Sequence, residues 1–187
     1  MTDYKSEIVS LNLKSNPIFD VNDQLKYTND WRGQYNGEAI AILKPQDKEE
    51  ISKIFKFAND NQISVVPQGG NTGLCGGATP LKNSLSIIIS TEKMNRIISI
   101  DKQSMSITVE PGVILSVIHD EVEKNNLFFP LSLGAKGSCT IGGNLSTNAG
   151  GINVLKYGNT RELCLGLEIV LPNGEIMNML KVLKKDN

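Results

Sequence analysis

The chain has 187 residues, of which 40% are hydrophobic and 21% charged, with a formal net charge of −1. This length allows one sizeable domain with its own core. The near-neutral charge and the 5% aromatic content argue against a basic or base-stacking surface, so no nucleic-acid partner is expected. No apolar run is long enough to span a membrane and the N-terminus lacks a secretory signal pattern, which predicts a cytoplasmic protein with no transmembrane segment.

The first part of the chain contains a strand–helix–strand pattern. Residues 1–30 are weakly patterned and predict a short helix, a loop and little core. Residues 39–43 predict a buried strand, and Asp47 with Glu50 resembles the capping box of the amphipathic helix that follows. A second strand over residues 63–66 completes the unit, which is typical of an α/β or α+β domain.

Two glycine-rich stretches dominate the rest of the pattern. Residues 65–80 contain five glycines within nine positions, and residues 134–151 contain six more. A strand that ends in such a loop directs several backbone N–H groups towards one point, which suits a phosphate. The alternative for a single glycine cluster is a flexible turn. Two such loops, each beside a strand-like segment, favour a dinucleotide site.

The remaining segments predict strands, helices and a hairpin. The strands are expected at 85–89, 96–100 and 104–110, the helices at 114–122 and near Thr140, and the hairpin at 165–171 with 175–179. His119, the only histidine, lies on the helix expected at residues 114–122. An isolated histidine there predicts a solvated or locally hydrogen-bonded side chain rather than a ligand. Cys75, Cys139 and Cys164 form no Cys-x-x-Cys pair and predict reduced thiols.

Common phosphate-binding motifs do not match these loops. A P-loop requires Gly-Lys-Ser/Thr at fixed spacing, but Lys136 is followed by Gly137. Neither loop contains the Rossmann pattern Gly-x-Gly-x-x-Gly, and Pro80 disfavours a helix after the first loop. The remaining device is a flavin pyrophosphate site built from two loops.

Several segments carry a family resemblance: 31–33, 65–80, 94–97, 130–151, 157–162 and 166–174. In these segments the sequence resembles the FAD-binding domain of the flavoprotein family named for p-cresol methylhydroxylase and vanillyl-alcohol oxidase. It is most similar to the branch of D-2-hydroxyglutarate dehydrogenase, D-lactate dehydrogenase and the glycolate oxidase subunit. The resemblance implies an α+β fold in which a small βαβ subdomain accompanies a larger mixed sheet with helices.

The resemblance also implies the domain boundaries. An N-terminal segment, 1–30, precedes an FAD-binding domain over 31–187. Within that domain the first subdomain covers 36–90, and the second covers 91–187 and is incomplete at its C-terminus. FAD lies between the two subdomains in this family.

The resemblance assigns cofactor contacts to both loops and to one strand. Around the pyrophosphate, mostly through backbone N–H groups, it implies Pro67, Gln68, Gly69, Gly70, Asn71, Thr72, Gly73 and Leu74. On the ribityl and isoalloxazine side it implies Ser138, Thr140, Gly142, Gly143, Asn144, Thr147, Asn148, Gly150 and Gly151, and at the adenosine end Ile169. The alternatives are turn chemistry for Gln68, Asn71 and Thr72, helix capping for Ser138 or Thr140, and a core position for Ile169.

Individual residues suggest how FAD is attached and where a substrate carboxylate could bind. Several relatives attach FAD through a histidine in the first loop, where this chain has Asn71, so non-covalent FAD is implied. Cys75 and Cys139 are more typical of small buried thiols than of a thioether. Tyr157 and Arg161 could bind a carboxylate, whereas an ion pair of Arg161 with Glu162 is the alternative. No catalytic residue and no metal ligand is assigned.

The implied function is that of the FAD-binding portion of a flavin-dependent dehydrogenase. Such an enzyme oxidises a D-2-hydroxy acid of the 2-hydroxyglutarate, lactate or glycolate type. The substrate domain, with its metal-holding histidines and acid, would come from a missing C-terminal domain or a partner chain, and 1–187 alone is expected to be inactive. The alternatives are the FAD domain of a peptidoglycan-precursor reductase and a flavin-binding subunit without turnover. The hydroxy acid, the electron acceptor and the oligomeric state are not encoded in recognisable motifs.

Overall fold

A computed structural model describes residues 3–180, and internal contacts divide this chain into two compact units. The first unit comprises residues 3–93 and 170–177, and the second comprises 94–169 and 178–180 among the described residues. Each unit is considered by itself below. The subdomain boundary between residues 90 and 91 stays a prediction.

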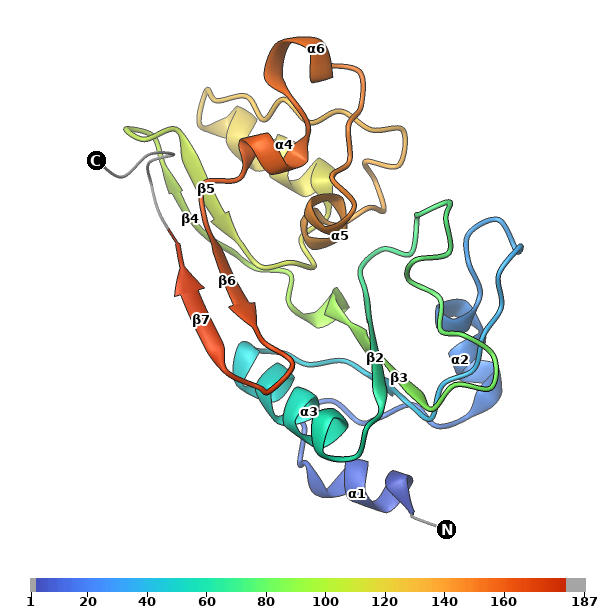
Figure 1. Ribbon diagram of the computed structural model, residues 1–187. Coiled ribbons are helices and arrows are strands. Elements are labelled where there is room, and N and C mark those ends of the chain that lie inside the picture. The colour runs from blue at the N-terminus through green and yellow to red at the C-terminus, as the bar shows by residue number, and fades with distance from the viewer. Residues whose placement is uncertain (1–2, 181–187) are drawn as a thin grey trace. The chain divides into compact units, whose positions relative to one another are not determined.

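The first unit is built on a parallel three-stranded sheet of order β1–β3–β2 (Figure 1). Its strands are β1 (Ile42–Leu43), β2 (Ser64–Gln68) and β3 (Ser86–Ser90). Helix α3 (Lys48–Asp60) connects β1 to β2, so the predicted strand–helix–strand unit is present. Strand β1 is shorter than predicted and covers only the last part of residues 39–43.

The N-terminal segment contributes more to this unit than its sequence predicts. It forms two helices, α1 (Tyr4–Ser10) and α2 (Val21–Thr28), each capped by an aspartate side chain. Ile8 is completely buried and Tyr27 is 5% exposed, so the expectation of little core is wrong. The apolar residues form no periodic pattern, because Val9, Val21 and Leu25 are exposed while Ile8 and Tyr27 supply the buried apolar side chains of the two helices.

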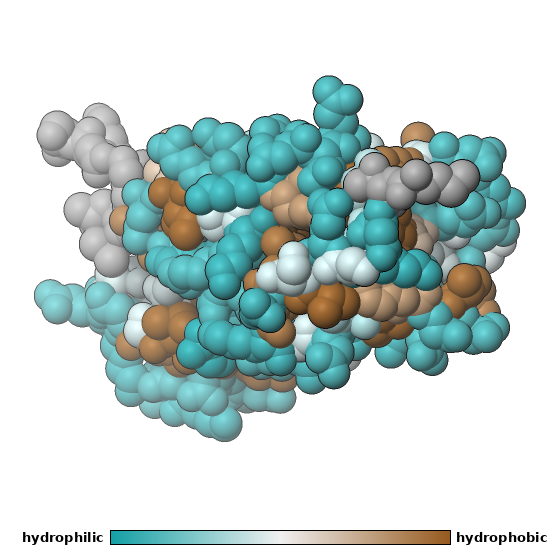
Figure 2. Space-filling view, turned by 90° about the horizontal axis from the view of Figure 1, so that it is seen from below, coloured by the Kyte–Doolittle hydropathy of each residue, from teal (hydrophilic) through white to brown (hydrophobic). Residues whose placement is uncertain are grey.

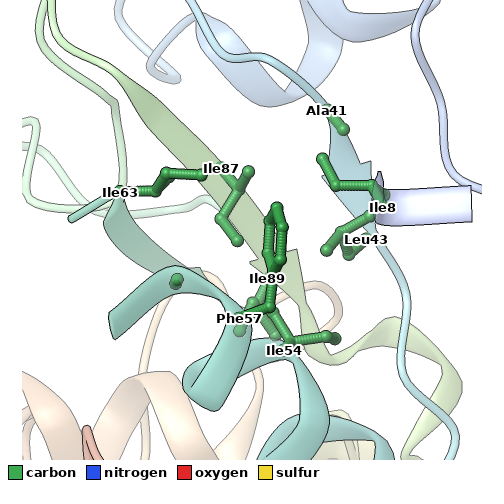
Figure 3. Close-up of a cluster of buried hydrophobic side chains, with 9 residues drawn as sticks. Ile8, Ala41, Leu43, Ile54, Phe57, Ile63, Ile87 and Ile89 are labelled. Carbon is green, nitrogen blue, oxygen red and sulfur yellow. The ribbon is translucent and has the colours of Figure 1, made fainter. Parts of the chain in front are cut away.

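Both faces of the parallel sheet are covered. On one face, Ile54 and Phe57 of α3 pack with Ile87 and Ile89, as Figure 3 shows. On the other face, Tyr27 of α2 packs with Ile42 and Ile88. A parallel strand buried on both faces reads as a continuous apolar run, which explains the sequence Ser-Ile-Ile-Ile-Ser of β3.

The N-terminus of α3 is held by two carboxylates. Asp47 Oδ1 accepts a hydrogen bond from the backbone N–H of Glu50 at 2.8 Å, as a capping box requires. The Glu50 carboxylate does not return to Asp47. It accepts instead from the backbone N–H groups of Gln46, at 2.7 Å, and of Lys14, and it thereby connects the helix to the N-terminal segment.

The second unit contains an antiparallel strand pair and short helices. The pair is β4 (Ile97–Asp101) with β5 (Ser106–Val109), which shows a register shift between Ile97 and Ser99. The helices are α4 (Leu115–Lys124), α5 (Ile141–Ser146) and α6 (Val154–Tyr157), with 3-10 turns at Thr91–Lys93 in the first unit and Thr160–Leu163 in the second. The core of this unit includes Val113, Ile118, Val122 and Ile141.

The predicted hairpin is present as β6 (Leu167–Val170) and β7 (Ile176–Met179), and the division between the units runs through it. Its tight turn packs on α3, because Ser52 Oγ donates to the Gly174 carbonyl at 2.5 Å. The α+β class is confirmed. Among the described residues, β4–β5 and β6–β7 are separate pairs instead of the implied larger mixed sheet, because each pair is joined by a short connection that favours local pairing.

The surface is mainly polar on the face that Figure 2 shows, where apolar atoms form several separate groups. None of the helices within residues 3–180 is long and apolar enough to cross a membrane.

Candidate functional site

The first glycine loop begins where β2 ends. Among the described residues, no protein acceptor receives a hydrogen bond from any backbone N–H between Gly69 and Leu74. Backbone donors without partners are rare in folded proteins unless solvent or a ligand satisfies them. Consecutive free N–H groups in a loop suit a phosphate, and the phosphate site that the glycine pattern predicts stays a prediction.

The amide side chains of this loop have a different role. Gln68 is 3% exposed, and its Nε2 donates to the carbonyls of Tyr27 and Ala78, both at 2.8 Å. Asn71 Nδ2 donates to the carbonyl of Asn29 at 2.8 Å and to that of Lys26 at 3.4 Å. The amide nitrogens of the two side chains therefore bind the protein, and the backbone N–H groups of the loop remain for a ligand.

The glycines of this loop differ in what the fold requires of them. At Gly76, φ is +70° and a Cβ would lie 2.7 Å from the Tyr35 ring, so the fold itself excludes a side chain. At Gly73 and Gly77, a Cβ would meet no described atom within 4 Å. Neither packing nor a positive φ explains these two glycines, whereas a ligand lying against the loop would do so.

The second glycine stretch contains a buried hydroxyl without a partner. Thr140 is the N-cap residue of α5 and is 6% exposed, but it makes no side-chain cap bond, and its Oγ1 has no hydrogen-bond partner among the described residues. The capping role considered for Thr140 is therefore wrong. Ser138 does not cap the helix either, since its Oγ donates to the Ala135 carbonyl at 3.4 Å.

Thr79 in the first unit has the only other buried side-chain oxygen without a partner in residues 3–180. Thr79 lies within the first glycine-rich stretch, residues 65–80, but is not among the cofactor contacts predicted from the sequence. A buried unsatisfied hydroxyl costs free energy, which makes each of the two threonines a candidate ligand contact.

Other predicted contacts of the second stretch have side chains engaged within their own unit. Asn144 is buried and its Nδ2 lies 3.6 Å from Cys139 Sγ. Thr147 Oγ1 donates to the Gly143 carbonyl at 2.9 Å, and Asn148 Oδ1 accepts from the backbone N–H of Arg161 at 3.1 Å. These positions shape the loop through their side chains.

Two predicted glycines of this stretch are required by the fold. At Gly151, φ is +94° and a Cβ would overlap the carbonyl oxygen of Ser132. At Gly142, a Cβ would lie 2.7 Å from Pro111 Cβ. By contrast, the nearest atom at Gly143 would be Thr140 Oγ1, at 3.5 Å.

Arg161 does not form the ion pair with Glu162 that the sequence suggested as an alternative, and binding of a carboxylate stays a prediction. Its guanidinium donates to the carbonyls of Leu145, at 3.3 Å, and Ser146, at 2.9 Å, at the C-terminal end of α5. Glu162 accepts instead from the backbone N–H of Asn159 at 2.6 Å, and the ion pair with Arg161 is not formed. The ring of Tyr157 packs against that of Phe128, with centroids 5.9 Å apart.

The burial of two cysteines and the hydrogen bond of the histidine can be compared with the predictions. Cys139 is buried as predicted, and its burial raises the pKa of the thiol, against a smaller lowering by the Asn144 hydrogen bond. Cys75 is exposed, so the prediction of a buried thiol is wrong there, because the loop that carries it has no packing partner over that side chain. His119 Nε2 lies 2.8 Å from the Leu131 carbonyl, so the predicted local hydrogen bond is present.

The predicted site residues belong to both units. Residues 67–74 lie in the first unit, whereas residues 138–151 and Ile169 lie in the second. Pro67 and Leu74 are exposed, and Ile169 is half-buried in β6. Within the described part of the chain, no three His, Cys, Asp or Glu side chains are grouped to hold a metal ion.

A parallel strand that ends in a loop of free N–H groups suits a phosphate-bearing ligand in a domain of the α+β class. The comparisons with known proteins define the class further. The model of the family "FAD binding domain" matches residues 39–180. The chain therefore belongs to this FAD-binding domain family.

Relatives and solved structures agree with this assignment. The chain is 44% identical over 166 residues to "D-2-hydroxyglutarate dehydrogenase, mitochondrial" of Danio rerio, covering 88% of the chain and 31% of that protein. It is 46% identical over 158 residues to "Probable D-2-hydroxyglutarate dehydrogenase, mitochondrial" of Oryza sativa subsp. indica, covering 84% of the chain and 28% of that protein. The fold matches a crystal structure of p-cresol methylhydroxylase with a TM-score of 0.76 at 24% identity, covering 95% of the chain and 36% of that protein.

The solved structure confirms the fold of the p-cresol methylhydroxylase type, the relatives confirm the similarity to D-2-hydroxyglutarate dehydrogenases, and the family match confirms FAD as the cofactor of the domain. The chain spans about a third or less of the length of the curated relatives it matches, 28% and 31% in the two compared above.

Proposed function

We propose that this chain is the FAD-binding portion of a flavin-dependent dehydrogenase that oxidises a D-2-hydroxy acid. The observation that carries the proposal is the row of free backbone N–H groups at Gly69–Leu74, beside the empty space at Gly73. The names of the two relatives above support 2-hydroxyglutarate as the first substrate to test.

The residues of each loop fit one part of the cofactor. The N–H groups of residues 69–74 would hold the pyrophosphate, because backbone donors in a concave loop match its charge. The Thr140 hydroxyl, which has no protein partner, would donate to a polar atom of the cofactor. The other predicted contacts of the second stretch and Ile169 remain part of this proposal.

The chemistry divides between the cofactor and the protein. Bound FAD supplies a ring system that accepts a hydride equivalent from the hydroxyl-bearing carbon of the substrate. The described residues bind and orient, and the only histidine, His119, is already engaged with the Leu131 carbonyl. We therefore assign removal of the hydroxyl proton to residues outside this chain, in a C-terminal domain or a partner chain.

Titration of the purified protein with FAD tests the cofactor assignment. Flavin fluorescence should saturate at one FAD per chain, and denaturation should release all flavin into the supernatant, because Asn71 stands where a covalent histidine would be. Flavin retained on the precipitated protein would contradict non-covalent binding. The absence of saturable binding would contradict the proposed function.

A substrate panel tests the reaction. The FAD-loaded chain alone should not be reduced by D-2-hydroxy acids, whereas addition of the C-terminal part of a dehydrogenase from the same genome should restore bleaching at 450 nm, about the wavelength at which oxidised flavin absorbs. Bleaching by a nicotinamide cofactor instead would support the peptidoglycan-precursor reductase. Turnover by the chain alone would show that the proton acceptor lies within it.

A cytoplasmic location is also a proposal. The two relatives carry "mitochondrial" in their names, which describes those proteins. Fractionation of the source cells with an antibody against this chain would decide between the two compartments.

A further inference from the structure

The end of helix α2 and the first glycine loop form one hydrogen-bonded structure. The last carbonyls of a helix have no partner inside it and must be satisfied from elsewhere. In α2, the Tyr27 carbonyl accepts from Gln68 Nε2, and the Lys26 and Asn29 carbonyls accept from Asn71 Nδ2. The glycine loop thus caps the helix through its two amide side chains.

The same bonds fix the backbone of the loop. Gln68 uses both amide protons, one on Tyr27 and one on Ala78, and so connects the start of the loop to its far end. Asn71 has a φ of +50°, a left-handed conformation in which asparagine is tolerated. With the side chains held by α2, the N–H groups of residues 69–74 are left without protein acceptors.

We infer that Gln68 and Asn71 are positioning residues, and that the C-terminal end of α2 with its C-cap, residues 26–29, is a structural part of the phosphate-binding loop. Residues 26–29 lie outside the matched family segment, 39–180. The inference rests on the proposed function, because it gives the loop its ligand. It predicts that loosening α2, even at its far end, weakens the order of the loop. A merely local role for the amides would not produce this coupling.

The first test loosens α2 without touching the loop. Asp20 is the N-cap of α2, and its Oδ1 accepts from the N–H groups of Asn22 and Asp23. Asp3 caps α1 in the same way and serves as the matched control. D20A should lower the backbone NMR order parameters of residues 69–74 from the value of a rigid backbone, about 0.85, towards that of a flexible one, about 0.6, whereas D3A should not.

The second test removes the amide of the loop itself. N71G keeps a residue that tolerates positive φ but deletes both bonds to α2. Asn61 makes the same kind of bond, from Nδ2 to the Phe57 carbonyl at 3.0 Å, at the end of α3, so N61G is the control. N71G should increase amide hydrogen exchange at residues 22–30. It should also raise the Kd for FAD by about tenfold, which corresponds to the loss of one uncharged hydrogen bond. N61G should leave both the exchange and the Kd unchanged.

Measurements in the FAD-free protein separate this inference from the proposed function. If the wild-type chain does not bind FAD, the proposed function fails, but the order parameters of residues 69–74 in D20A still decide the coupling. Equal order parameters at residues 69–74 in D20A and D3A would overturn the inference. So would an N71G variant whose FAD affinity falls while exchange at residues 22–30 stays at the wild-type rate.

Discussion

The guanidinium group of Arg161 caps helix α5, with Nη2 2.9 Å from the carbonyl oxygen of Ser146. A cation at this end of a helix satisfies free carbonyls and interacts favourably with the helix dipole. The guanidinium group of an arginine suits bidentate contact with a carboxylate, which is why the sequence suggested a substrate contact. The geometry gives it a structural role within its own unit.

R161A should therefore lower the free energy of unfolding by about 1 kcal/mol, the value of a net hydrogen bond to a helix end, and R161K should lower it less. Chemical denaturation monitored by circular dichroism measures both. K136A, at an exposed lysine of the same unit, is the control and should change stability by less than about 0.5 kcal/mol. An altered flavin potential in R161A at unchanged stability would instead support a role at the cofactor.

Substitutions at Gly151 and Gly73 distinguish a glycine that the fold requires from a glycine that ligand binding requires. G151A forces a side chain into a positive φ and onto the Ser132 carbonyl, so it should destabilise the protein by about 2 kcal/mol or more. G73A places a methyl group in open space and should leave the unfolding midpoint nearly unchanged. It should weaken FAD binding at least about tenfold, since the methyl occupies space assigned to the pyrophosphate. Wild-type FAD affinity in G73A would contradict that assignment.

The buried carboxylate of Glu50 predicts a third effect. It is 3% exposed and accepts from two backbone N–H groups, those of Gln46 and Lys14. E50Q presents an amide that can accept at one atom only, so it should lower the free energy of unfolding by about 1–3 kcal/mol. E49Q, at an exposed neighbour in the same helical turn, should have little effect. Equal midpoints for the two variants in urea unfolding would show that the buried contacts are dispensable.

The pKa of Asp30 predicts a pH dependence. The Tyr35 N–H donates to Asp30 Oδ1 at 2.6 Å and holds the pKa of this carboxyl below its ordinary value, with a smaller contribution from the Arg32 N–H and against the opposing effect of burial. A lowered pKa in the folded state means that the carboxylate stabilises the fold above its unfolded pKa, near about 4, and loses this contribution as the pH falls through the folded value. The stability difference between wild type and D30N should therefore be constant near neutral pH and shrink below about pH 4. A difference that grows on acidification would reverse the assigned sign.

The thiols predict an order of modification. Cys75 is exposed, whereas Cys139 is buried and its burial raises the pKa of the thiol. Because the thiolate is the reactive form, iodoacetamide at pH 8, about half a unit below an ordinary thiol pKa, should alkylate Cys75 first and Cys139 only on unfolding. Peptide mass spectrometry of a time course would show the order. Early labelling of Cys139 in the folded protein would mean that its site opens to solvent.

The predictable parts of the molecule are those with strong local signals. Helix α3 follows from its apolar spacing and the Asp47 cap, and β3 follows from three consecutive isoleucines. Helix α2 was missed, because Val21 and Leu25 on it are exposed and only Tyr27 carries the apolar contact. Such a helix depends on its tertiary partner, and single-sequence patterns do not contain that partner.

The candidate site divides in the same way. The glycine clusters predicted the position of the loop with free backbone N–H groups, because glycine by its residue type allows backbone conformations that other residues avoid. The roles of the Gln68, Asn71 and Arg161 side chains were not predictable, since their partners are carbonyl groups, which every residue possesses. The buried hydroxyl of Thr140 likewise becomes a signal only when its burial and lack of partners are seen.

The strand order of the parallel sheet has a consequence for how the protein is made. The middle strand, β3, is the last of the three in the chain, and it pairs Ile88 with both Ile42 and Val66. Apart from the bridge that Ile42 forms with Ile18, β1 and β2 have no strand to pair with until β3 has been synthesised, and such distant parallel pairings form slowly. On the ribosome, the β3 edge of each strand is therefore exposed for a time, and a chaperone that binds extended apolar segments would find its target there. The first glycine loop thus reaches its folded form only after β3, the strand that follows it in the chain, has paired with β2.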